Sequence, residues 1–296
     1  MNILKAILLG LLQGVTEFLP ISSSGHLSLA QHLLGVSGDT SLLFTVMLHL
    51  GTLAAVFIVY YRTIWALAVE FFMMISDIIH KKFSFSNMSP TRRMLVMLVV
   101  SCLPLLILLI PTGGGMKLLD RVSVFSTDDS ILAEGVCFIV TAVLLILGSL
   151  SAKNRKKRRK ALGTGDALVV GIAQTVAAAL PGVSRSGSTI STGLICGIAK
   201  ETMVQYSFIL GIPAILAASL MEFKDAVEAG STVEPIPLII GIAVAAVSGV
   251  LSIALLRWIL KKDYFRYFGY YCGVLGIITV ILGIIEKAAG IYIGIH

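Results

Sequence analysis

The chain has 296 residues, of which 57% are hydrophobic and only 13% are charged, and its mean hydropathy is +0.96. Soluble domains are about 45–50% apolar and about 25% charged, so this composition excludes a soluble globular protein and indicates an integral membrane protein. The net charge of +7 does not argue for nucleic-acid binding, because seven of the 23 basic residues stand in the single segment 153–160.

The N-terminal segment predicts a helix over 3–19 that breaks inside an apolar run. Pro20 disfavours helical geometry in the residue before it, so the helix should stop there. After the three serines 22–24 a second half-helix is expected over about 25–34, with a serine hydroxyl as its cap. The two pieces predict a re-entrant hairpin over 3–34. Free backbone N–H groups at such a helix start form a ready site for phosphate.

Four further apolar segments complete the first half of the chain. A bilayer span needs about 20 apolar residues. The segment 63–79 is apolar but contains Glu70 and Asp77, and it is interpreted as a helix that lies along the membrane interface. The remaining segments predict clear spans at about 41–61, 94–110 and 131–150.

The same order returns after the basic segment, with a broken pair at 166–180 and 188–198 and three spans at about 203–221, 236–256 and 267–285. Each half is therefore a re-entrant broken-helix pair plus three transmembrane helices. Because three is odd, the second half enters from the opposite face. We expect an all-α integral membrane protein with an inverted-topology repeat. Its parts are a first repeat over 1–150, a basic cytoplasmic loop over 151–165, and a second repeat over 166–296 with its hairpin at 166–198.

The charge distribution predicts an orientation. With segment 153–160 placed inside, the cytoplasmic loops collect most of the basic residues and the outside loops collect many of the acidic ones. Both termini then face outward, and the first broken hairpin opens to the outer face. A contact with anionic lipids is the alternative explanation for the basic segment.

A polar motif occurs in both broken pairs at a constant separation. Glu17 in the first copy aligns with Ala178 in the second, and Ser24 aligns with Arg185, so one copy supplies a carboxylate and the other an arginine. Paired broken segments in two halves are the best sequence indication of a site at the membrane midplane. The residues that match are Gly10, Gln13, Pro20 and Ser23 with Gly171, Gln174, Pro181 and Ser184.

Glu17 and Arg185 are the first candidates for function, because ionisable groups at membrane depth are costly and usually functional. A carboxylate suits metal binding or acid–base chemistry, while the alternative is a structural carboxylate. An arginine suits a bidentate phosphate clamp, while the alternative is a buried ion pair with Glu17. The two interpretations of Arg185 are compatible when no ligand is bound.

Three polar residues near Glu17 carry open alternatives. Ser23 is a nucleophile or phosphate contact activated by His26, or only a helix cap, and Ser184 is its pseudo-symmetric rival. Gln13 offers an amide oxygen to a metal shell, or a hydrogen bond between helices. His49, inside the predicted span 41–61, is interpreted mainly as a hydrogen bonder between helices, and a contact with the site is the alternative.

The broken pairs resemble a known family over essentially the whole chain. Gln13-x-x-x-Glu17, Ser22-Ser23-Ser24-Gly25-His26 and Pro181-Gly182-x-Ser184-Arg185-Ser186-x-x-Thr189 are similar to the signature motifs of the undecaprenyl-diphosphate phosphatase family, the bacitracin-resistance proteins. The family often has Glu at position 13, where this chain has Gln. The resemblance implies hydrolysis of undecaprenyl diphosphate to undecaprenyl phosphate and phosphate, which recycles the lipid carrier of peptidoglycan synthesis and gives bacitracin resistance.

The resemblance also implies a site, a cofactor and a location. A divalent cation, Mg²⁺ or Ca²⁺, would be held by Glu17 and Gln13. The expected location is a bacterial plasma (inner) membrane, with a polyprenyl diphosphate lipid as substrate and membrane lipids around it. The oligomeric state stays open, a homodimer included. The implied catalytic residues are Glu17, Ser23, His26 and Arg185, and the implied substrate-binding residues are Gln13, Ser22, Ser24, Gly25, Ser184, Ser186 and Thr189.

A transporter is the competing class, because inverted repeats and broken helices are at least as typical of secondary transporters as of enzymes. A polyprenyl-phosphate flippase would hold a head group with the same arginine and the same helix starts without cleaving it.

Overall fold

The computed structural model describes residues 2–34, 39–84, 88–112, 116–123, 131–154, 157–180, 182–228, 230 and 234–289. Within these ranges the chain is helical and has no β-strand, which confirms the predicted all-α fold class. Pro181, residues 124–130 of the predicted acidic loop and residues 290–296 at the C-terminus lie outside the described residues.

The first broken pair forms close to the predicted bounds. α1 (Ile3–Phe18) ends where Leu19 turns to extended backbone, at φ −68° and ψ 139°, because Pro20 follows it. α2 (Ser23–Leu33) begins directly after Ser22, which caps it.

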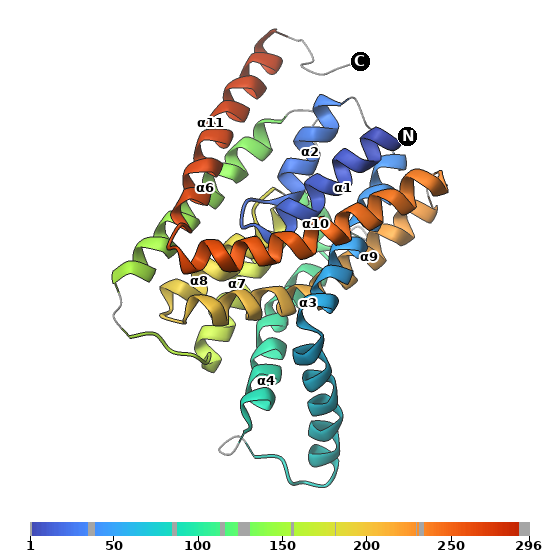
Figure 1. Cartoon of the computed structure of the whole chain (residues 1–296). Helices are drawn as coiled ribbons and strands as arrows, with labels where there is room; N and C mark the ends of the chain where they lie inside the picture. The colour runs from blue at the N-terminus through green and yellow to red at the C-terminus, as the bar shows by residue number, and fades with distance from the viewer. Residues whose placement is uncertain are drawn as a thin grey trace.

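The next two predicted segments meet at a kink, close to the boundary that the sequence predicts. α3 (Asp39–Ile79) runs for 41 residues and bends at Tyr60, where φ is −111° and ψ is 20°. No proline or glycine separates the predicted segments 41–61 and 63–79, so helical hydrogen bonding resumes beyond the bend. The kink at Tyr60 agrees with the predicted boundary between the two segments, and the position of residues 63–79 along the membrane interface stays a prediction. In Figure 1 the far half of α3 and α4 (Pro90–Cys102) form a hairpin that projects from the rest of the molecule.

The predicted span 94–110 changes its helix type part-way. α4 passes directly into η1 (Leu103–Leu109), a 3-10 helix with Pro104 near its start, where proline removes a backbone donor. A short helix that the sequence did not predict, α5 (Leu118–Ser123), follows in the loop before the long helix α6 (Leu132–Asn154).

The second half repeats the order of the first. Among the described residues six helices are long and apolar enough to cross a membrane, judged by length and composition, three in each half. The chain is therefore a multi-pass membrane protein. The helices of the second half are α7 (Thr164–Ala179), α8 (Arg185–Ile195), α9 (Lys200–Glu228), α10 (Pro235–Lys261) and α11 (Arg266–Ala289).

Helices of the first half pack against helices of the second half. α1 packs along α10, and α7, its counterpart in the second half, packs along α4 and η1; α3 packs on α9, and α6 packs on α11. This pattern supports a repeat related by a two-fold rotation. The boundaries at 150 and 165, and the inversion relative to a membrane, stay predictions.

The contact between α1 and α10 requires small residues. A Cβ atom on Gly10 would lie 2.6 Å from the backbone oxygen of Gly241, a distance that real side chains do not reach. The helix axes can approach this closely because both positions are glycine. Gly10 and Gly14 therefore lie on a close-packing face of α1.

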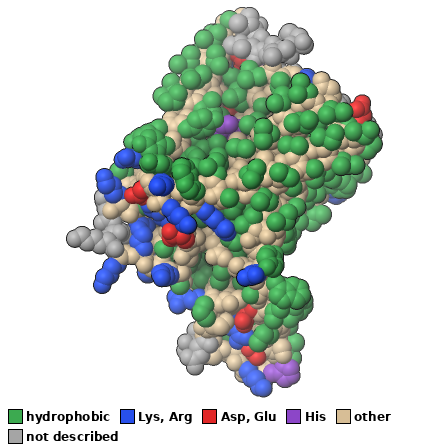
Figure 2. Space-filling model, viewed as in Figure 1, with side chains coloured by type: hydrophobic (Ala, Val, Ile, Leu, Met, Phe, Trp, Pro, Cys, Tyr) green, Lys and Arg blue, Asp and Glu red, His purple; other side chains and the backbone are tan. Residues whose placement is uncertain are grey.

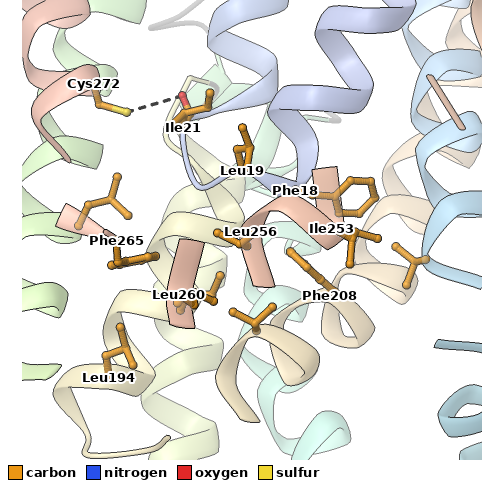
Figure 3. Packing of buried hydrophobic residues seen from close by; sticks show 14 of the residues in the cluster. Phe18, Leu19, Ile21, Leu194, Phe208, Ile253, Leu256, Leu260, Phe265 and Cys272 are labelled. Atoms are coloured by element: carbon orange, nitrogen blue, oxygen red, sulfur yellow. Dashed lines mark hydrogen bonds between the residues drawn. The ribbon is translucent and has the colours of Figure 1, made fainter. Parts of the chain in front are cut away.

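The largest buried cluster encloses the break of the first pair. Figure 3 shows this packing, in which residues of α9, α10 and α11 surround the turn after α1. The thiol of Cys272 on α11 reaches the backbone oxygen of Ile21 at 3.9 Å. The packing fixes the backbone on the N-terminal side of Ser22. The labelled members of the cluster are Phe18, Leu19, Ile21, Leu194, Phe208, Ile253, Leu256, Leu260, Phe265 and Cys272.

The surface agrees with a membrane environment. Hydrophobic side chains cover most of the upper body in Figure 2, while lysines and arginines gather at the left and lower parts of the molecule. Many large hydrophobic side chains on the long helices are more than 40% exposed. Such an apolar exterior requires lipid rather than water.

Candidate active site

The breaks of the two pairs lie in contact. The backbone N–H of Gly182, in the turn before α8, donates to the hydroxyl of Ser24 on α2 at 3.1 Å. A Cβ atom on Gly187 would lie 3.0 Å from the backbone oxygen of Pro20. These contacts bring the two breaks, and the polar motif that each of them carries, into one place.

Each short helix begins at a serine cap. Ser22 Oγ accepts from the backbone N–H of Gly25 at 3.2 Å, and Ser184 Oγ accepts from the backbone N–H of Gly187 at 3.0 Å. Ser22 is thus the structural counterpart of Ser184, and the alignment of Ser23 with Ser184 is wrong by one residue.

The second turn is longer by one residue, which explains the shift in register. Gly182 supplies the added length at φ +106°, a left-handed conformation that glycine adopts at little cost. The first turn is shorter and places Ser22 at φ 76°, which is unusual for a residue with a side chain. As the first residues of α2 and α8, Ser23 and Arg185 therefore occupy equivalent positions.

Glu17, near the end of α1, gathers donors from both halves of the chain. Its Oε1 accepts from Arg185 Nη2 at 2.7 Å, and its Oε2 accepts from Ser23 Oγ at 2.6 Å. Gln13 lies one helical turn earlier, and its Nε2 donates to the same Oε2 at 3.1 Å. The Glu17 side chain is only 6% exposed. A buried carboxylate with a cation and two neutral donors is stable as the charged form.

α9 holds the guanidinium of Arg185 from the other side. Arg185 Nη1 donates to the backbone oxygen of Ser207 at 3.3 Å. A Cβ atom on Gly211 would lie 2.7 Å from Arg185 Cζ, so the guanidinium fits against α9 only because that position is glycine. The arginine is therefore fixed in direction by α9 and by Glu17.

Glu17, Ser23 and Arg185 line a cavity of about 250 Å³ where the two breaks meet. Small residues of α7 and α9 form its apolar wall, and His49 from α3 and Glu222 from α9 complete the polar lining. Of the predicted site residues, the lining includes Glu17, Ser23, Ser24, Ser184, Arg185 and Ser186.

Other predicted site residues support the cavity from outside it. Gln13 is fully buried behind Glu17. Ser22 is occupied as a cap, and Gly25 packs against the ring of Phe138. Thr189 Oγ1 lies 2.6 Å from Ser207 Oγ and joins α8 to α9. Ser22, Gly25 and Thr189 are therefore engaged in the packing around the cavity, while Gln13 keeps one amide oxygen without a hydrogen-bond partner in the described part of the chain.

His26 points away from Ser23. Its Nδ1 lies 2.7 Å from the backbone oxygen of Ser22, and its Nε2 lies 2.7 Å from the hydroxyl of Tyr271 on α11. The imidazole stacks on the Tyr271 ring at 5.6 Å and meets Phe138 edge-on at 4.9 Å. Both ring nitrogens are thus engaged elsewhere, and the predicted Ser23–His26 pair does not form in this structure.

His49 is the histidine that faces the cavity. Its Nε2 lies 3.9 Å from Glu17 Oε2, and its Nδ1 lies 2.9 Å from the backbone oxygen of Thr45 in the same helix. Its hydrogen bond stays within its own helix, so the main interpretation as a hydrogen bonder between helices is wrong, and the alternative, a contact with the site, is what the structure shows.

The donor set decides what kind of metal ion the site suits. No group of three or more His, Cys, Asp or Glu side chains is arranged for a metal within the described ranges. Gln13 Oε1, however, is buried and has no hydrogen-bond partner in the described part of the chain, and it is held next to Glu17. The residues fit Mg²⁺ or Ca²⁺ with one or two protein oxygens and further ligands from a phosphate group and water, and do not fit a cation held by protein alone.

Comparison with known proteins decides the family. The model of the family described as bacitracin resistance protein BacA matches residues 6–278. This chain belongs to the BacA family. A relative named undecaprenyl-diphosphatase from Alkaliphilus metalliredigens is 39% identical over 287 residues, which cover 96% of this chain and 100% of the relative.

Relatives from other organisms have the same name. An undecaprenyl-diphosphatase of Halothermothrix orenii is 39% identical over 283 residues, covering 95% of this chain and 98% of the relative. One from Methanosphaera stadtmanae is 36% identical over 290 residues, which cover 96% of this chain and 99% of the relative. The similarity of this BacA-family chain to these proteins thus spans both broken pairs.

Four residues of the site were missed or underrated from the sequence of this BacA-family chain. His49 and Glu222 lie in long spans outside the repeated motif, so no local pattern pointed to the cavity. Ser207 contributes only its backbone oxygen to Arg185, and Gly211 contributes only space. An intramembrane charge was the one available signal, and Glu222 was instead assigned to an outside segment.

Proposed function

We propose that this chain is a membrane-embedded phosphatase that hydrolyses undecaprenyl diphosphate to undecaprenyl phosphate and inorganic phosphate. The observation that carries the proposal is the buried cluster of Glu17, Ser23 and Arg185 in a cavity between two broken helix pairs. The names of the full-length relatives give the substrate. The reaction recycles the lipid carrier of cell-wall synthesis and confers bacitracin resistance.

Arg185 is the proposed clamp for the diphosphate. In the absence of substrate its guanidinium is paired with Glu17. Phosphate oxygens can take the place of this partner, because the planar fork of arginine matches two oxygens of one phosphate. The helix starts at Ser23 and Arg185 face the same cavity, and their backbone N–H groups favour an anion there.

Ser23 is the proposed nucleophile. Its hydroxyl already donates to Glu17 Oε2, so the carboxylate is in position to accept the proton as Oγ attacks the terminal phosphorus. The bond from that phosphorus to the bridging oxygen breaks, and undecaprenyl phosphate leaves. Water then attacks the phosphoserine, which releases phosphate and restores the Ser23 hydroxyl. Ser184 is a weaker candidate, because its oxygen caps α8.

The two histidines have different proposed roles. His49, 3.9 Å from Glu17, exchanges a proton with that carboxylate during the two steps. His26 is a positioning residue: it bonds to the backbone oxygen of Ser22 and so holds the strained turn that presents Ser23.

A divalent cation completes the proposed site. Glu17 and the unpaired Gln13 Oε1 would hold Mg²⁺ or Ca²⁺, which when bound neutralises part of the diphosphate charge. The protein residues bind and orient the head group, and the prenyl chain remains among the helices and lipid.

The proposed location is the bacterial plasma (inner) membrane, with segment 153–160 in the cytoplasm and the cavity opening to the outer face. The asymmetry of basic residues between loops supports this orientation.

The direct test is phosphate release from undecaprenyl diphosphate by the purified protein in detergent. Release at a rate proportional to protein concentration, abolished by EDTA, supports a phosphatase. A protein that binds the lipid but releases no phosphate is a transporter, and the proposed reaction is then wrong.

A further inference from the structure

A second cavity lies at the bend of α3 and has a volume of about 430 Å³. Its walls come from α3 around the bend, from the first turns of α9 and from the last turns of α10. None of its lining residues also lines the active-site cavity. The reaction proposed above therefore makes no use of it.

The lining is basic. Arg62, Arg257 and Lys261 contribute three positive charges, and Glu201 contributes the single negative charge among the lining residues. None of the three cations forms an ion pair within the described part of the chain. Three basic side chains that share one cavity without paired carboxylates create a positive potential, which favours an anion.

Both arginines are held by aromatic rings. Arg257 Cζ lies 4.6 Å from the centre of the Tyr60 ring, at the bend itself. Arg62 Nε donates to the Tyr61 hydroxyl at 2.8 Å. Stacking uses the flat face of the Arg257 guanidinium, and the bond to Tyr61 uses Nε of Arg62 and leaves its two terminal nitrogens as donors. The bend thus orders two arginines at little cost to their capacity for binding an anion.

The same cavity has an apolar wall, and exposed aromatic side chains lie next to its two arginines in the sequence. Val204 and Leu260 are buried lining residues. Tyr61 and Trp258 are 58% and 54% exposed and stand beside the two arginines in sequence. Exposed tyrosine and tryptophan of membrane helices favour the head-group layer. A cavity with basic groups and apolar walls at this level suits an amphiphile with a charged head group.

We propose that this cavity is a second anion site, which binds the phosphate group of a phospholipid through Arg62, Arg257 and Lys261. Free inorganic phosphate offers the same chemistry to the arginines but not to the apolar wall. The test below therefore compares a phospholipid with inorganic phosphate, to decide which of the two the cavity binds.

The test measures thermal unfolding of the detergent-solubilised protein with dioctanoyl phosphatidic acid, with dioctanoyl phosphatidylcholine, or with inorganic phosphate. The variant is Arg62→Gln with Arg257→Gln, and the matched control is Lys81→Gln with Lys82→Gln, which removes the same charge from exposed residues at the far end of α3. Phosphate release without added lipid verifies that each variant is folded, because no substituted residue lines the active site.

A phosphate-bearing ligand can also bind at the active site and raise Tm there. The rise in Tm that is seen in the wild type but lost in the arginine variant is therefore the part that reports on this cavity. For the wild type and the lysine control we expect phosphatidic acid to raise Tm by about 2–4 °C at saturating concentration. In the arginine variant at least half of this rise should disappear, while basal phosphate release stays within twofold of wild type.

A variant-sensitive rise with phosphatidic acid alone supports a lipid site. The same rise with inorganic phosphate supports the phosphate site and assigns it to the free ion. An equal rise in the wild type and the arginine variant, or no rise in the wild type with either ligand, overturns the proposal. Neither of these results affects the proposed phosphatase reaction.

Discussion

Arg185 Nη2 donates to Glu17 Oε1 at 2.7 Å across 168 residues of sequence. This pair joins the end of α1 in the first half to the start of α8 in the second. Neither broken pair contains both groups, so the cavity is chemically complete only where the halves meet. The pair also holds the Arg185 side chain in an orientation suited to phosphate, because the guanidinium already points toward an anionic oxygen.

Arg185→Lys tests the clamp. Lysine keeps the charge but loses the planar fork, so we expect kcat/KM to fall by about 10²-fold or more, with an unchanged elution volume in size-exclusion chromatography. The measurement is steady-state phosphate release against undecaprenyl diphosphate concentration. Turnover close to wild type in the folded lysine variant would show that Arg185 does not grip two phosphate oxygens.

Gly211→Ala tests the role of α9 in directing Arg185. The new Cβ would lie 2.7 Å from Arg185 Cζ, so the guanidinium must shift. Because a displacement of about 1 Å can cost up to 10²-fold in rate, we expect kcat/KM to fall by about tenfold. Gly273→Ala is the matched control, since its Cβ would meet only Ala142 Cβ at 3.7 Å. Equal activities in the two variants would contradict the fixed arginine.

Position 17 should control the metal requirement more strongly than position 13. Glu17→Gln removes the carboxylate that contacts both Ser23 and Arg185, so turnover should be lost, or the metal concentration for half-maximal rate should rise steeply. Gln13→Ala should cost less, because water replaces a neutral ligand, and Gln13→Glu should be tolerated. The measurement is initial rate against Mg²⁺ or Ca²⁺ concentration. Full activity of Glu17→Gln with an unchanged metal dependence would exclude Glu17 as ligand and as base.

The orientation in the membrane can be tested by labelling. In a background without Cys102, Cys137, Cys196 and Cys272, a cysteine at Lys224 should react with a membrane-impermeant thiol reagent in intact cells. A cysteine at Lys82 should react only after the membrane is permeabilised. Both side chains are exposed, so access depends on the side of the membrane. The reverse pattern would place the active site on the cytoplasmic side.

Sequence reasoning succeeded where one local signal dominates. Pro20 alone ends α1, and the isolated intramembrane charges Glu17 and Arg185 alone suggest a pair, which the structure contains. Composition also predicts the long apolar helices, because each must satisfy its backbone hydrogen bonds internally.

Sequence reasoning failed where the position of a residue depends on packing between distant segments. The constant spacing of the repeats aligned Ser23 with Ser184, but the turn at Gly182 is one residue longer, and the true counterpart of Ser184 is Ser22. The direction of His26 depends on Tyr271, which lies 245 residues away. No sequence pattern near either residue contains that information.

The two broken pairs have different proposed roles: the first supplies the reacting hydroxyl and carboxylate, and the second supplies the arginine that binds the phosphate. The most direct measurement compares phosphate release from undecaprenyl diphosphate by Ser23→Ala and by Ser184→Ala, with folding verified by thermal unfolding. We expect Ser23→Ala to lose about 10³-fold or more in kcat, the scale of a lost nucleophile. Ser184→Ala should lose about tenfold or less, mainly through a weaker cap on α8. Near wild-type release by Ser23→Ala, together with a large loss in Ser184→Ala, would contradict these roles.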